Sequence, residues 1–223
     1  MSEPAFHADA LRLFALLRRK DRAKAKALIC RSLQSASIEF VHLKIMLPVI
    51  GLAGAAASRG EIPAGKSQAI FAEIRDLLAD IRRRMIRSKE LGLKTVIVGL
   101  PGEMHGAGLK LIGDWLWRDG WTVAMPPLDT SEAGVIQFVE RQRPDMLALS
   151  CSLPRQAATA RRIIRHLRAA GFTRPIWIGG MAINAYPELF PRTLADDTAP
   201  NIVDFSRRLA AQFGYSTATP PDL

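Results

Sequence analysis

The sequence predicts an α/β protein in which an N-terminal four-helix bundle precedes a doubly wound parallel sheet. Three observations predict this class. Residues 5 to about 90 carry apolar residues at helical spacing and no strand-like alternation. From Lys94 onward, short and nearly continuous apolar runs alternate with amphipathic helical segments, as in parallel strands covered by helices on both faces. A hydrophobic content of 48% over 223 residues is enough for a substantial core, in one large domain or two small ones.

Four helices are expected in the first half. The segment ADALRLFALLRR places Leu11, Phe14 and Leu17 on one face, and RAKAKALICRSL follows it. Ser37 is a suitable N-cap for the next helix, SIEFVHLKIMLPVIGLAGAAA. A turn at residues 61–63 (EIP) opens a long amphipathic helix, SQAIFAEIRDLLADIRRRMI.

The second half is expected to be a flavodoxin- or Rossmann-like doubly wound domain. Its predicted strands are KTVIVGL, GWTVAM, DMLALSCSL and PIWIGG, with RTLADDT as the only candidate for a weak fifth. Each strand is followed by a helical segment, and the last of these is APNIVDFSRRLAAQFG. A linker near residues 88–93 divides the chain into a helical cap bundle, 1–90, and an α/β domain, 91–223.

Composition narrows the classes of function. The formal charge of +10 would favour an acidic ligand or partner, but Arg-rich segments such as IRRRMIRSK also have helical apolar spacing and are interpreted as solvated helix faces. No nucleic-acid-binding motif accompanies the charge, so direct nucleic-acid binding is not expected. No signal peptide is visible, and the apolar run IMLPVIGLAGAAA is judged too short to span a bilayer, so no membrane partner is expected. Two cysteines, Cys30 and Cys151, cannot form a disulfide framework, which favours a cytoplasmic location.

Three loops are expected to meet at the carboxyl ends of the strands, where doubly wound sheets bind their ligands. PGEMHGAG follows the first predicted strand, SCSLPRQ carries Ser150 and Ser152 at the end of the third, and GGMA begins with Gly179 and Gly180 at the end of the fourth. Together they describe a crevice with hydroxyl donors on one wall and bare backbone on another. Such a crevice suits a large ligand with a long polar tail.

His105, in the first loop, is the candidate metal ligand, although a histidine in this position can also simply cap the helix that follows. Glu103 lies two residues earlier and could accept the second N–H of the imidazole, an arrangement that fixes the tautomer of a ligating histidine. The sequence has no cluster of His, Cys or carboxylates with zinc spacing. A metal held by a macrocycle needs only one axial protein ligand, so the pattern favours a tetrapyrrole. A single histidine such as His105 can supply that ligand.

The segment EMHGAG resembles the Asp-x-His-x-x-Gly signature of cobalamin-binding domains, as found in methionine synthase, corrinoid methyl carriers and light-sensing cobalamin regulators. The resemblance implies that His105 is the lower cobalt ligand. It also implies that Glu103 takes the place of the family's Asp and that Gly108 leaves room for the nucleotide tail of the cofactor.

Two further segments of the α/β half carry the same resemblance. The family's tail-contacting Ser-x-Leu is matched by Ser150, whereas Ser152 stands at the Leu position and Leu153 comes one residue later. The Gly-Gly pair that accommodates the buried base is matched by Gly179 and Gly180. LADDTAPNIVDFSRRLA is similar to the family's closing segment, so the resemblance covers essentially the whole α/β domain.

The helical half resembles the family's cap bundle through the segment IMLPVIGLAGAAASRGEIPAGKSQA. Photoreceptors of the family carry a Trp and a Glu-His pair here, whereas this chain has Ala57, Ser67 and Gln68. The upper-face chemistry of those photoreceptors is therefore not carried over. The smaller side chains would open a cavity for a different upper ligand or a different tetrapyrrole.

The resemblance implies a tetrapyrrole-binding sensor or regulatory protein that takes cobalamin, responds to light or another signal, and acts through a regulatory or enzyme partner protein, with self-association as an option. No nucleophile–base pair or acid–base dyad is visible, so catalysis by this chain alone is not favoured. Two alternatives stay open. One is a corrinoid methyl carrier with a partner methyltransferase. The other is a scaffold for biliverdin or haem, with His105 contacting the pyrrole nitrogens or serving as the axial ligand of iron, and with Cys151 as a candidate for a covalent bilin adduct.

Overall fold

A computed structural model describes residues 3–102 and 106–217 of the chain. Its internal contacts divide the molecule into two compact units, the first made of residues 1–85 and 105–111 and the second of residues 86–104 and 112–223. The predicted domain boundary between residues 90 and 91 stays a prediction.

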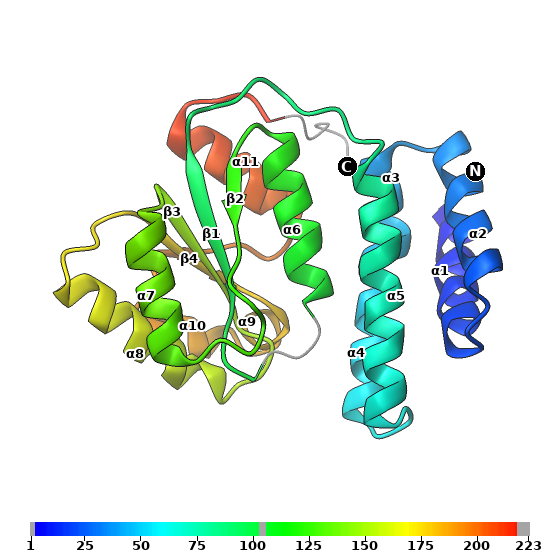
Figure 1. Ribbon diagram of the computed structural model, residues 1–223, viewed down its shortest axis with the longest axis horizontal. Coiled ribbons are helices and arrows are strands. Elements are labelled where there is room, and N and C mark those ends of the chain that lie inside the picture. The colour runs from blue at the N-terminus through cyan, green and yellow to red at the C-terminus, as the bar shows by residue number, and fades with distance from the viewer. Residues whose placement is uncertain (1–2, 103–105, 218–223) are drawn as a thin grey trace. The chain divides into compact units, whose positions relative to one another are not determined.

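The helical unit contains four helical rods among its described residues, as predicted (Figure 1). Its elements are α1 (Glu3–Arg18), α2 (Arg22–Ser35), α3 (Ile38–Val41), the π-helical turn η1 (His42–Met46), α4 (Leu47–Ser58) and α5 (Ala64–Arg82). Because α3, η1 and α4 follow one another without a break, they form a single rod.

Capping side chains and an apolar interior explain why this half is helical. Ser37 caps α3 as predicted, because its hydroxyl accepts the Phe40 N–H at 3.2 Å. Asp21 caps α2 in the same way by accepting the Lys24 N–H. The apolar faces of α1 and α5 are buried, and their fully buried residues include Leu13, Leu17, Ile74, Leu78 and Ile81.

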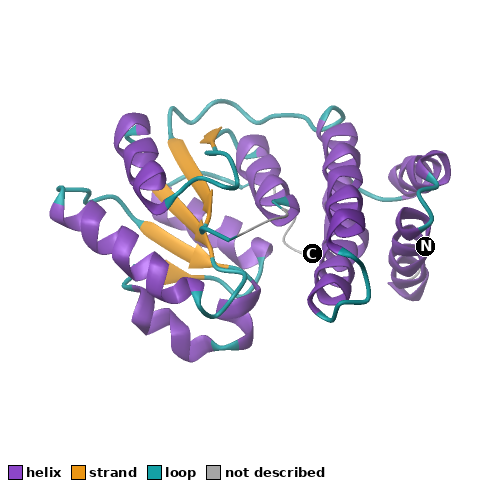
Figure 2. Cartoon of the chain, turned by 60° about the horizontal axis from the view of Figure 1, so that its bottom comes forward, coloured by secondary structure: helices purple, strands orange, loops and turns teal. Residues whose placement is uncertain are grey.

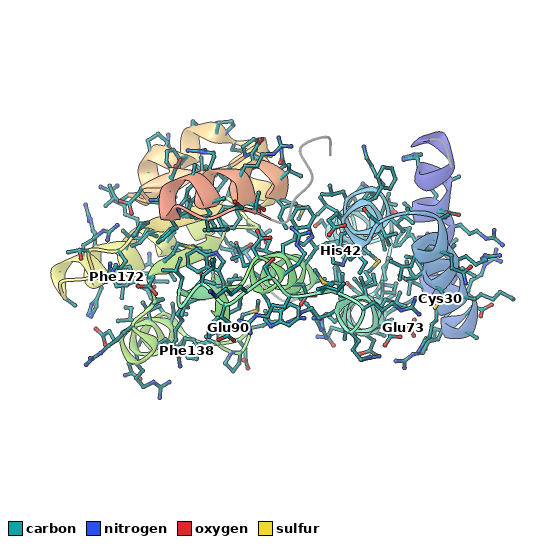
Figure 3. The ribbon with its side chains drawn as sticks, turned by 90° about the horizontal axis from the view of Figure 1, so that it is seen from above. Cys30, His42, Glu73, Glu90, Phe138 and Phe172 are labelled. Atoms are coloured by element: carbon teal, nitrogen blue, oxygen red, sulfur yellow. The ribbon has the colours of Figure 1, made fainter. Side chains whose placement is uncertain are left out.

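The third rod passes Pro48 by means of the π-helical turn. Proline has no N–H, and in a regular α-helix its ring clashes with the carbonyl four residues earlier. Here the Leu47 N–H bonds to the carbonyl of His42, five residues back, which widens the turn directly before Pro48. His42, labelled in Figure 3, is itself fully buried. The rod therefore continues from Ile38 to Ser58, over 21 residues with a mean hydropathy of 1.7.

The apolar run IMLPVIGLAGAAA, judged too short to cross a bilayer, lies within the longer helical rod Ile38–Ser58. Within the described part of the chain, Ile38–Ser58 is the one helix that is long and apolar enough to do so by length and composition. The core helix of a soluble protein passes the same test, and 44% of this stretch is buried inside the structure. One such helix is weak evidence for a membrane span, and the expected absence of a membrane partner stays a prediction.

Helices α2 and α5 run in the same direction with a constant offset of 54 residues. Two contacts, spaced one helical turn apart, join them in this register: Arg22–Asp76 and Lys26–Asp80. A third contact with the same offset, Cys30–Arg84, follows just beyond the end of α5. The charged pairs lie largely in solvent, where an ion pair contributes little to stability. Their common offset identifies which turns of the two helices lie against each other.

The second unit is built on a five-stranded parallel sheet. The strands are β1 (Lys94–Gly99), β2 (Thr122–Ala124), β3 (Met146–Ser150), β4 (Ile176–Gly179) and β5 (Asp197–Thr198). Their order, β2-β1-β3-β4-β5, is that of flavodoxin-like folds, as predicted. The two residues of β5 lie within RTLADDT, so the weak fifth strand is confirmed.

Helices cover both faces of this sheet (Figures 1 and 2). They are α6 (Ala107–Arg118), α7 (Glu132–Gln142), α8 (Gln156–Ala169), α9 (Met181–Ala185), the 3-10 turn η2 (Pro187–Leu189), α10 (Phe190–Thr193) and α11 (Ile202–Phe213). The residues of α6 up to Leu111 are grouped with the first unit. The longer helices α6, α7 and α8 each follow a strand, as predicted, and α11 lies in the predicted segment APNIVDFSRRLAAQFG. The short α9, η2 and α10 between β4 and β5 were not predicted.

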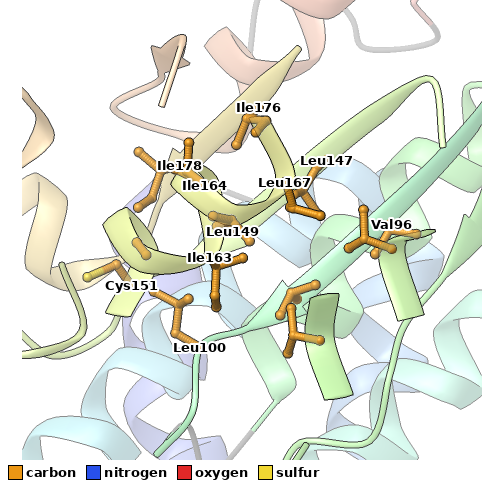
Figure 4. Close-up of a cluster of buried hydrophobic side chains, with 14 of the residues drawn as sticks. Val96, Leu100, Leu147, Leu149, Cys151, Ile163, Ile164, Leu167, Ile176 and Ile178 are labelled. Carbon is orange, nitrogen blue, oxygen red and sulfur yellow. The ribbon is translucent and has the colours of Figure 1, made fainter. Parts of the chain in front are cut away.

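The strands are apolar on both sides because each face packs against helices. Alternate residues of β1, β3 and β4, among them Val96, Leu149 and Ile178, form one cluster with α7 and α8 (Figure 4). The intervening residues face the opposite way. Trp177 is one of them, and its ring meets that of Phe205 on α11 edge to face, with centroids 5.2 Å apart.

Carboxylates hold the amino ends of the strands. Asp145 accepts the Lys94 N–H at 2.9 Å, and Asp196 accepts the Ile176 N–H at 2.7 Å. Both bonds satisfy backbone donors at the first residue of a strand, where the ladder ends.

A buried polar network closes the same edge before β2. The Asp119 carboxylate, with no exposed surface, accepts hydrogen bonds from Ser206 at 2.7 Å, Thr217 at 3.0 Å and Arg118 at 3.1 Å. The Arg118 side chain is only 4% exposed, so this is a buried ion pair with hydrogen-bonding support. The network ties α11 and the segment that follows it to the end of α6.

Trp121 and Tyr215 extend this network. The indole Nε1 of Trp121 donates to the Tyr215 hydroxyl at 3.0 Å. Burial raises the pKa of Tyr215 to about 12, so its hydroxyl is neutral under ordinary conditions.

Candidate functional site

The carboxyl ends of three neighbouring strands form the candidate site. Gly99, Ser150 and Gly179, the last residues of β1, β3 and β4, lie side by side in register. The chain order reverses at this point, because β1 has β2 on one side and β3 on the other. In doubly wound sheets, ligands bind at such a topological switch point. The structure therefore brings Ser150, Ser152 and Gly179 to one edge, as the sequence predicted.

The serine loop, residues 150–153, follows β3. Ser150, Ser152 and Leu153 are each partly exposed, so two hydroxyl groups and one apolar side chain can reach a ligand. The backbone of Cys151, between them, is fixed to the turn after β4: its N–H donates to Gly179 at 2.8 Å, and its carbonyl accepts the Ala182 N–H at 3.1 Å.

Cys151 itself is buried. Its thiol donates to the Leu153 carbonyl at 3.4 Å, and burial raises its pKa to about 11. A protonated thiol without solvent access is a poor nucleophile. The structure thus argues against the covalent bilin adduct considered for Cys151 and favours a small packing residue.

The two glycines after β4 have different surroundings. Gly180 has φ +108°, and a Cβ there would lie 2.5 Å from the Cys151 carbonyl oxygen, so the close approach of the serine loop already requires glycine. At Gly179, by contrast, a Cβ would meet no atom within 4 Å, and the same is true of Gly108 at the start of α6. Open space therefore adjoins the backbone at Gly179 and not at Gly180.

Gln156, the first residue of α8, was not singled out from the sequence. Its side-chain Nε2 donates to the carbonyls of Leu100 and Pro101, both at 3.2 Å, and its Oε1 accepts the N–H groups of Ser152 at 2.8 Å and Leu153 at 2.9 Å. A signal was present in the sequence, because Gln156 is a polar residue on the apolar face of α8, in line with the buried residues Ala160, Ile163, Ile164 and Leu167.

Other predicted residues lie away from this edge or outside the description. Glu103 and His105 fall outside the described residues, so the predicted axial ligand has no described geometry. In the helical unit, Ala57 is half-buried on α4 and Gln68 is exposed on α5. Ser67 is buried, with no hydrogen-bond partner for its Oγ among the described atoms. Among these same described residues, no group of three or more His, Cys, Asp or Glu could hold a metal ion.

Residues 93–201 match the family model of the B12 binding domain. A comparison with curated proteins found no match. Among solved structures, the monomethylamine corrinoid protein of Methanosarcina barkeri is similar with a TM-score of 0.75 and 13% identity, over 90% of this chain and 96% of that chain. At this identity the likeness shows a shared fold, the helical half included.

Two more solved structures are similar with lower scores. A cobalamin-binding protein from Desulfitobacterium hafniense has 17% identity over 93% of this chain and 98% of that chain, with a TM-score of 0.49. The methanol:cobalamin methyltransferase complex MtaBC from Methanosarcina barkeri has 13% identity over 92% of this chain and 79% of that chain, with a TM-score of 0.47.

The segment 93–201 is therefore a domain of the cobalamin-binding family, and its cofactor is cobalamin, as predicted. The described residues fit that cofactor. Gly179 leaves bare backbone beside open space, and Ser150 and Ser152 offer hydroxyl groups to a polar tail at the topological switch point. Nothing found favours the alternatives biliverdin and haem.

Proposed function

We propose that this protein is a corrinoid carrier, which holds cobalamin and presents it to a partner methyltransferase. The observation that carries the proposal is the pairing of a four-helix unit with a cobalamin-binding domain in one chain. The monomethylamine corrinoid protein shares this fold over 90% of the present chain. Bound cobalamin supplies a cobalt centre that can accept and release a methyl group. The protein's own residues bind and orient that cofactor.

Most of the predicted site residues have a role in this proposal. His105 serves as the lower cobalt ligand, and Glu103 accepts the second N–H of its imidazole and so holds one tautomer. Ser150 and Ser152 donate to the nucleotide tail, while Gly179 leaves space for its base. Gly108, where a Cβ would also meet open space, lets the tail pass the start of α6.

The regulatory function expected from the sequence, including a response to light, is the competing proposal. The residues at the photoreceptor positions weigh against it, since Ala57, Ser67 and Gln68 cannot supply the aromatic ring and the Glu-His pair of those proteins. Cytoplasmic location, self-association and the absence of a nucleic-acid partner also remain predictions.

Absorption spectroscopy of the purified chain tests the proposal. The protein is incubated with hydroxocobalamin, methylcobalamin or adenosylcobalamin, desalted, and measured in the dark and after illumination. His105→Ala is compared with His166→Ala, a matched control because His166 is an exposed histidine on α8. Retained cobalamin whose spectrum changes only in His105→Ala supports histidine ligation.

A second step separates carrier from sensor. The loaded protein is chemically reduced and offered methyl iodide, and the product spectrum is compared in dark and light. Acceptance of a methyl group without any light response supports the carrier. A light-induced spectral or oligomeric change in a protein that accepts no methyl group overturns it in favour of the sensor, and failure to retain any cobalamin overturns both.

A further inference from the structure

Gln156 joins two loops that the fold brings together at the candidate site. Its side chain is buried, with 2% of the residue exposed, and it bonds to four backbone groups on two different segments. Two are carbonyls of the loop after β1, and two are N–H groups of the serine loop. A primary amide has two N–H donors and one carbonyl acceptor with two lone pairs, so these four bonds use its full capacity.

We propose that Gln156 is a positioning residue for cobalamin, which fixes the loop after β1 to the serine loop so that both are presented to the cofactor in one geometry. This inference rests on the proposed binding of cobalamin. Gln156 is assigned no contact with the cofactor, and acts only through the two loops.

The position of these bonds in the fold carries the argument. The regular ladder between β1 and β3 ends with the Leu100 N–H, which donates to Ser150 at 3.2 Å. Beyond that bond, the Gln156 amide links the loop after β1 to the serine loop after β3. Without it, the carbonyls of Leu100 and Pro101 would lose their partner at a buried or half-buried place, which costs about 1–3 kcal/mol per group.

The bonds also set the direction in which the first loop leaves the sheet. After the anchored carbonyl of Pro101, Gly102 has φ +91°, a conformation that side chains disfavour. A Cβ on Gly102 would point at the Gln156 Nε2, 3.8 Å away, and at the Arg155 guanidinium, 3.9 Å away. The turn at Gly102 therefore lies next to the Gln156 amide that hydrogen-bonds to the preceding residue.

Glutamine is required here because its amide nitrogen donates hydrogen bonds to one loop and its amide oxygen accepts them from the other. The nitrogen faces two carbonyls and the oxygen faces two N–H groups, so the reverse orientation would place like partners together. In Gln156→Glu the two acceptor bonds to the serine loop can persist, while both donor bonds to Leu100 and Pro101 are lost. In Gln156→Met the volume is kept and all four bonds are lost.

The test compares these variants with two controls. Gln137→Glu makes the same change of charge at an exposed position of α7. Ser206→Ala removes a buried hydrogen bond to Asp119 and so weakens the same unit without touching either loop. For each protein, the hydroxocobalamin dissociation constant is measured by titration, and hydrogen exchange of the cofactor-free form is followed by mass spectrometry.

A spectroscopic signature distinguishes positioning from loss of stability. The EPR signal of bound cob(II)alamin carries hyperfine splitting from the nitrogen of its axial ligand, and labelling the protein's histidines with ¹⁵N changes that splitting only if a histidine is the ligand. We expect Gln156→Glu to weaken cobalamin binding by roughly 10–100-fold, as for other residues that orient a metal ligand, and to reduce the histidine-derived splitting. Neither control should do so.

The exchange data identify which loop is released. Gln156→Glu should speed exchange in the peptide that contains residues 100–102 and leave the N–H groups of Ser152 and Leu153 protected, whereas Gln156→Met should speed both. Wild-type affinity and splitting in both Gln156 variants would overturn the inference while leaving the proposed function intact. If the wild-type protein itself retains no cobalamin, both the proposed function and the positioning role of Gln156 fail. This outcome is distinguishable, because cobalamin retention by the wild-type protein is measured before any variant is compared.

Discussion

The two edges of the sheet in the second unit are held together by different chemistry. At the amino edge, three aspartates accept backbone or side-chain donors, and one of them, Asp119, is fully buried with its arginine partner. At the carboxyl edge, the link is a neutral amide, that of Gln156, and open space adjoins Gly179.

The difference follows from what each edge must do. Charge-assisted hydrogen bonds are short and strong, and a buried ion pair is strongly destabilised by the loss of one partner. Such bonds at the amino edge fix the strand ends and occupy the polar groups that form them. An edge that admits a ligand has to leave polar groups and space available. A neutral side chain that bonds only to backbone can order the loops there without adding a charge beside the cofactor.

Removing the buried carboxylate should have the largest effect on stability. Asp119→Ala removes the buried carboxylate that pairs with Arg118 and takes an acceptor from Ser206 and Thr217, so we expect a loss of about 3–5 kcal/mol in the free energy of unfolding. Urea unfolding followed by circular dichroism measures it.

The matched control replaces both members of the pair by leucine, at positions 118 and 119, and should regain much of that stability because no unpaired charge remains. A loss below about 1 kcal/mol in Asp119→Ala would mean that the amino edge is not closed by this ion pair.

The two glycines after β4 should separate stability from binding at the carboxyl edge. Gly180→Ala forces a Cβ against the Cys151 carbonyl at a positive φ, so we expect a loss of roughly 2–3 kcal/mol and a displaced serine loop. Gly179→Ala meets no atom and should change the free energy of unfolding by less than about 0.5 kcal/mol.

Cobalamin binding to Gly179→Ala tests whether the cofactor uses the open space beside Gly179. Gly179→Ala places a methyl group in the space assigned to the cofactor and should weaken hydroxocobalamin binding by about tenfold or more, although the protein stays folded. Unchanged affinity in a stable Gly179→Ala protein would show that the cofactor does not use this space.

The smallest effect is expected at Tyr215. Tyr215→Phe removes the acceptor of the Trp121 indole N–H and should cost about 1 kcal/mol near neutral pH. Because burial raises the pKa of Tyr215 from 10.0 to about 12 in the folded protein, the folded state holds this proton more tightly than the unfolded chain.

The stability linked to that proton is therefore present in full below pH 10 and is lost as the pH rises through about 12. Wild-type protein should lose stability more steeply than Tyr215→Phe over this range in alkaline urea titrations. Parallel curves for the two proteins would contradict the assignment of a buried, neutral Tyr215.

Much of the fold could be predicted from local pattern. Nearly continuous apolar runs identified the strands, apolar residues at helical spacing identified the long helices, Ser37 identified a cap, and RTLADDT contained the fifth strand. The third rod was predicted at nearly its observed length, but the π-helical turn that carries it past Pro48 was not predicted, because such a turn has no simple sequence signal. The short α9, η2 and α10 are too brief for periodicity to reveal.

The candidate site was likewise predicted in part. Loop chemistry placed Ser150, Ser152 and Gly179 at one edge, because parallel strands all end on the same side. The sequence treated Gly179 and Gly180 as equivalent, and only the approach of Cys151 distinguishes them. Gln156 was missed because its four partners lie on segments as far as 56 residues away.

The sequence by itself determined which segments are helix and strand, that the strands are parallel, and which loops carry groups suited to cobalamin, since these depend on residue type and local spacing. Tertiary structure alone decided which backbone groups Gln156 joins, which glycine is closed by its neighbour and which aspartate is buried with an arginine. These outcomes depend on distances between segments remote in the chain, and hydrogen bonds and van der Waals contacts act only over a few ångströms.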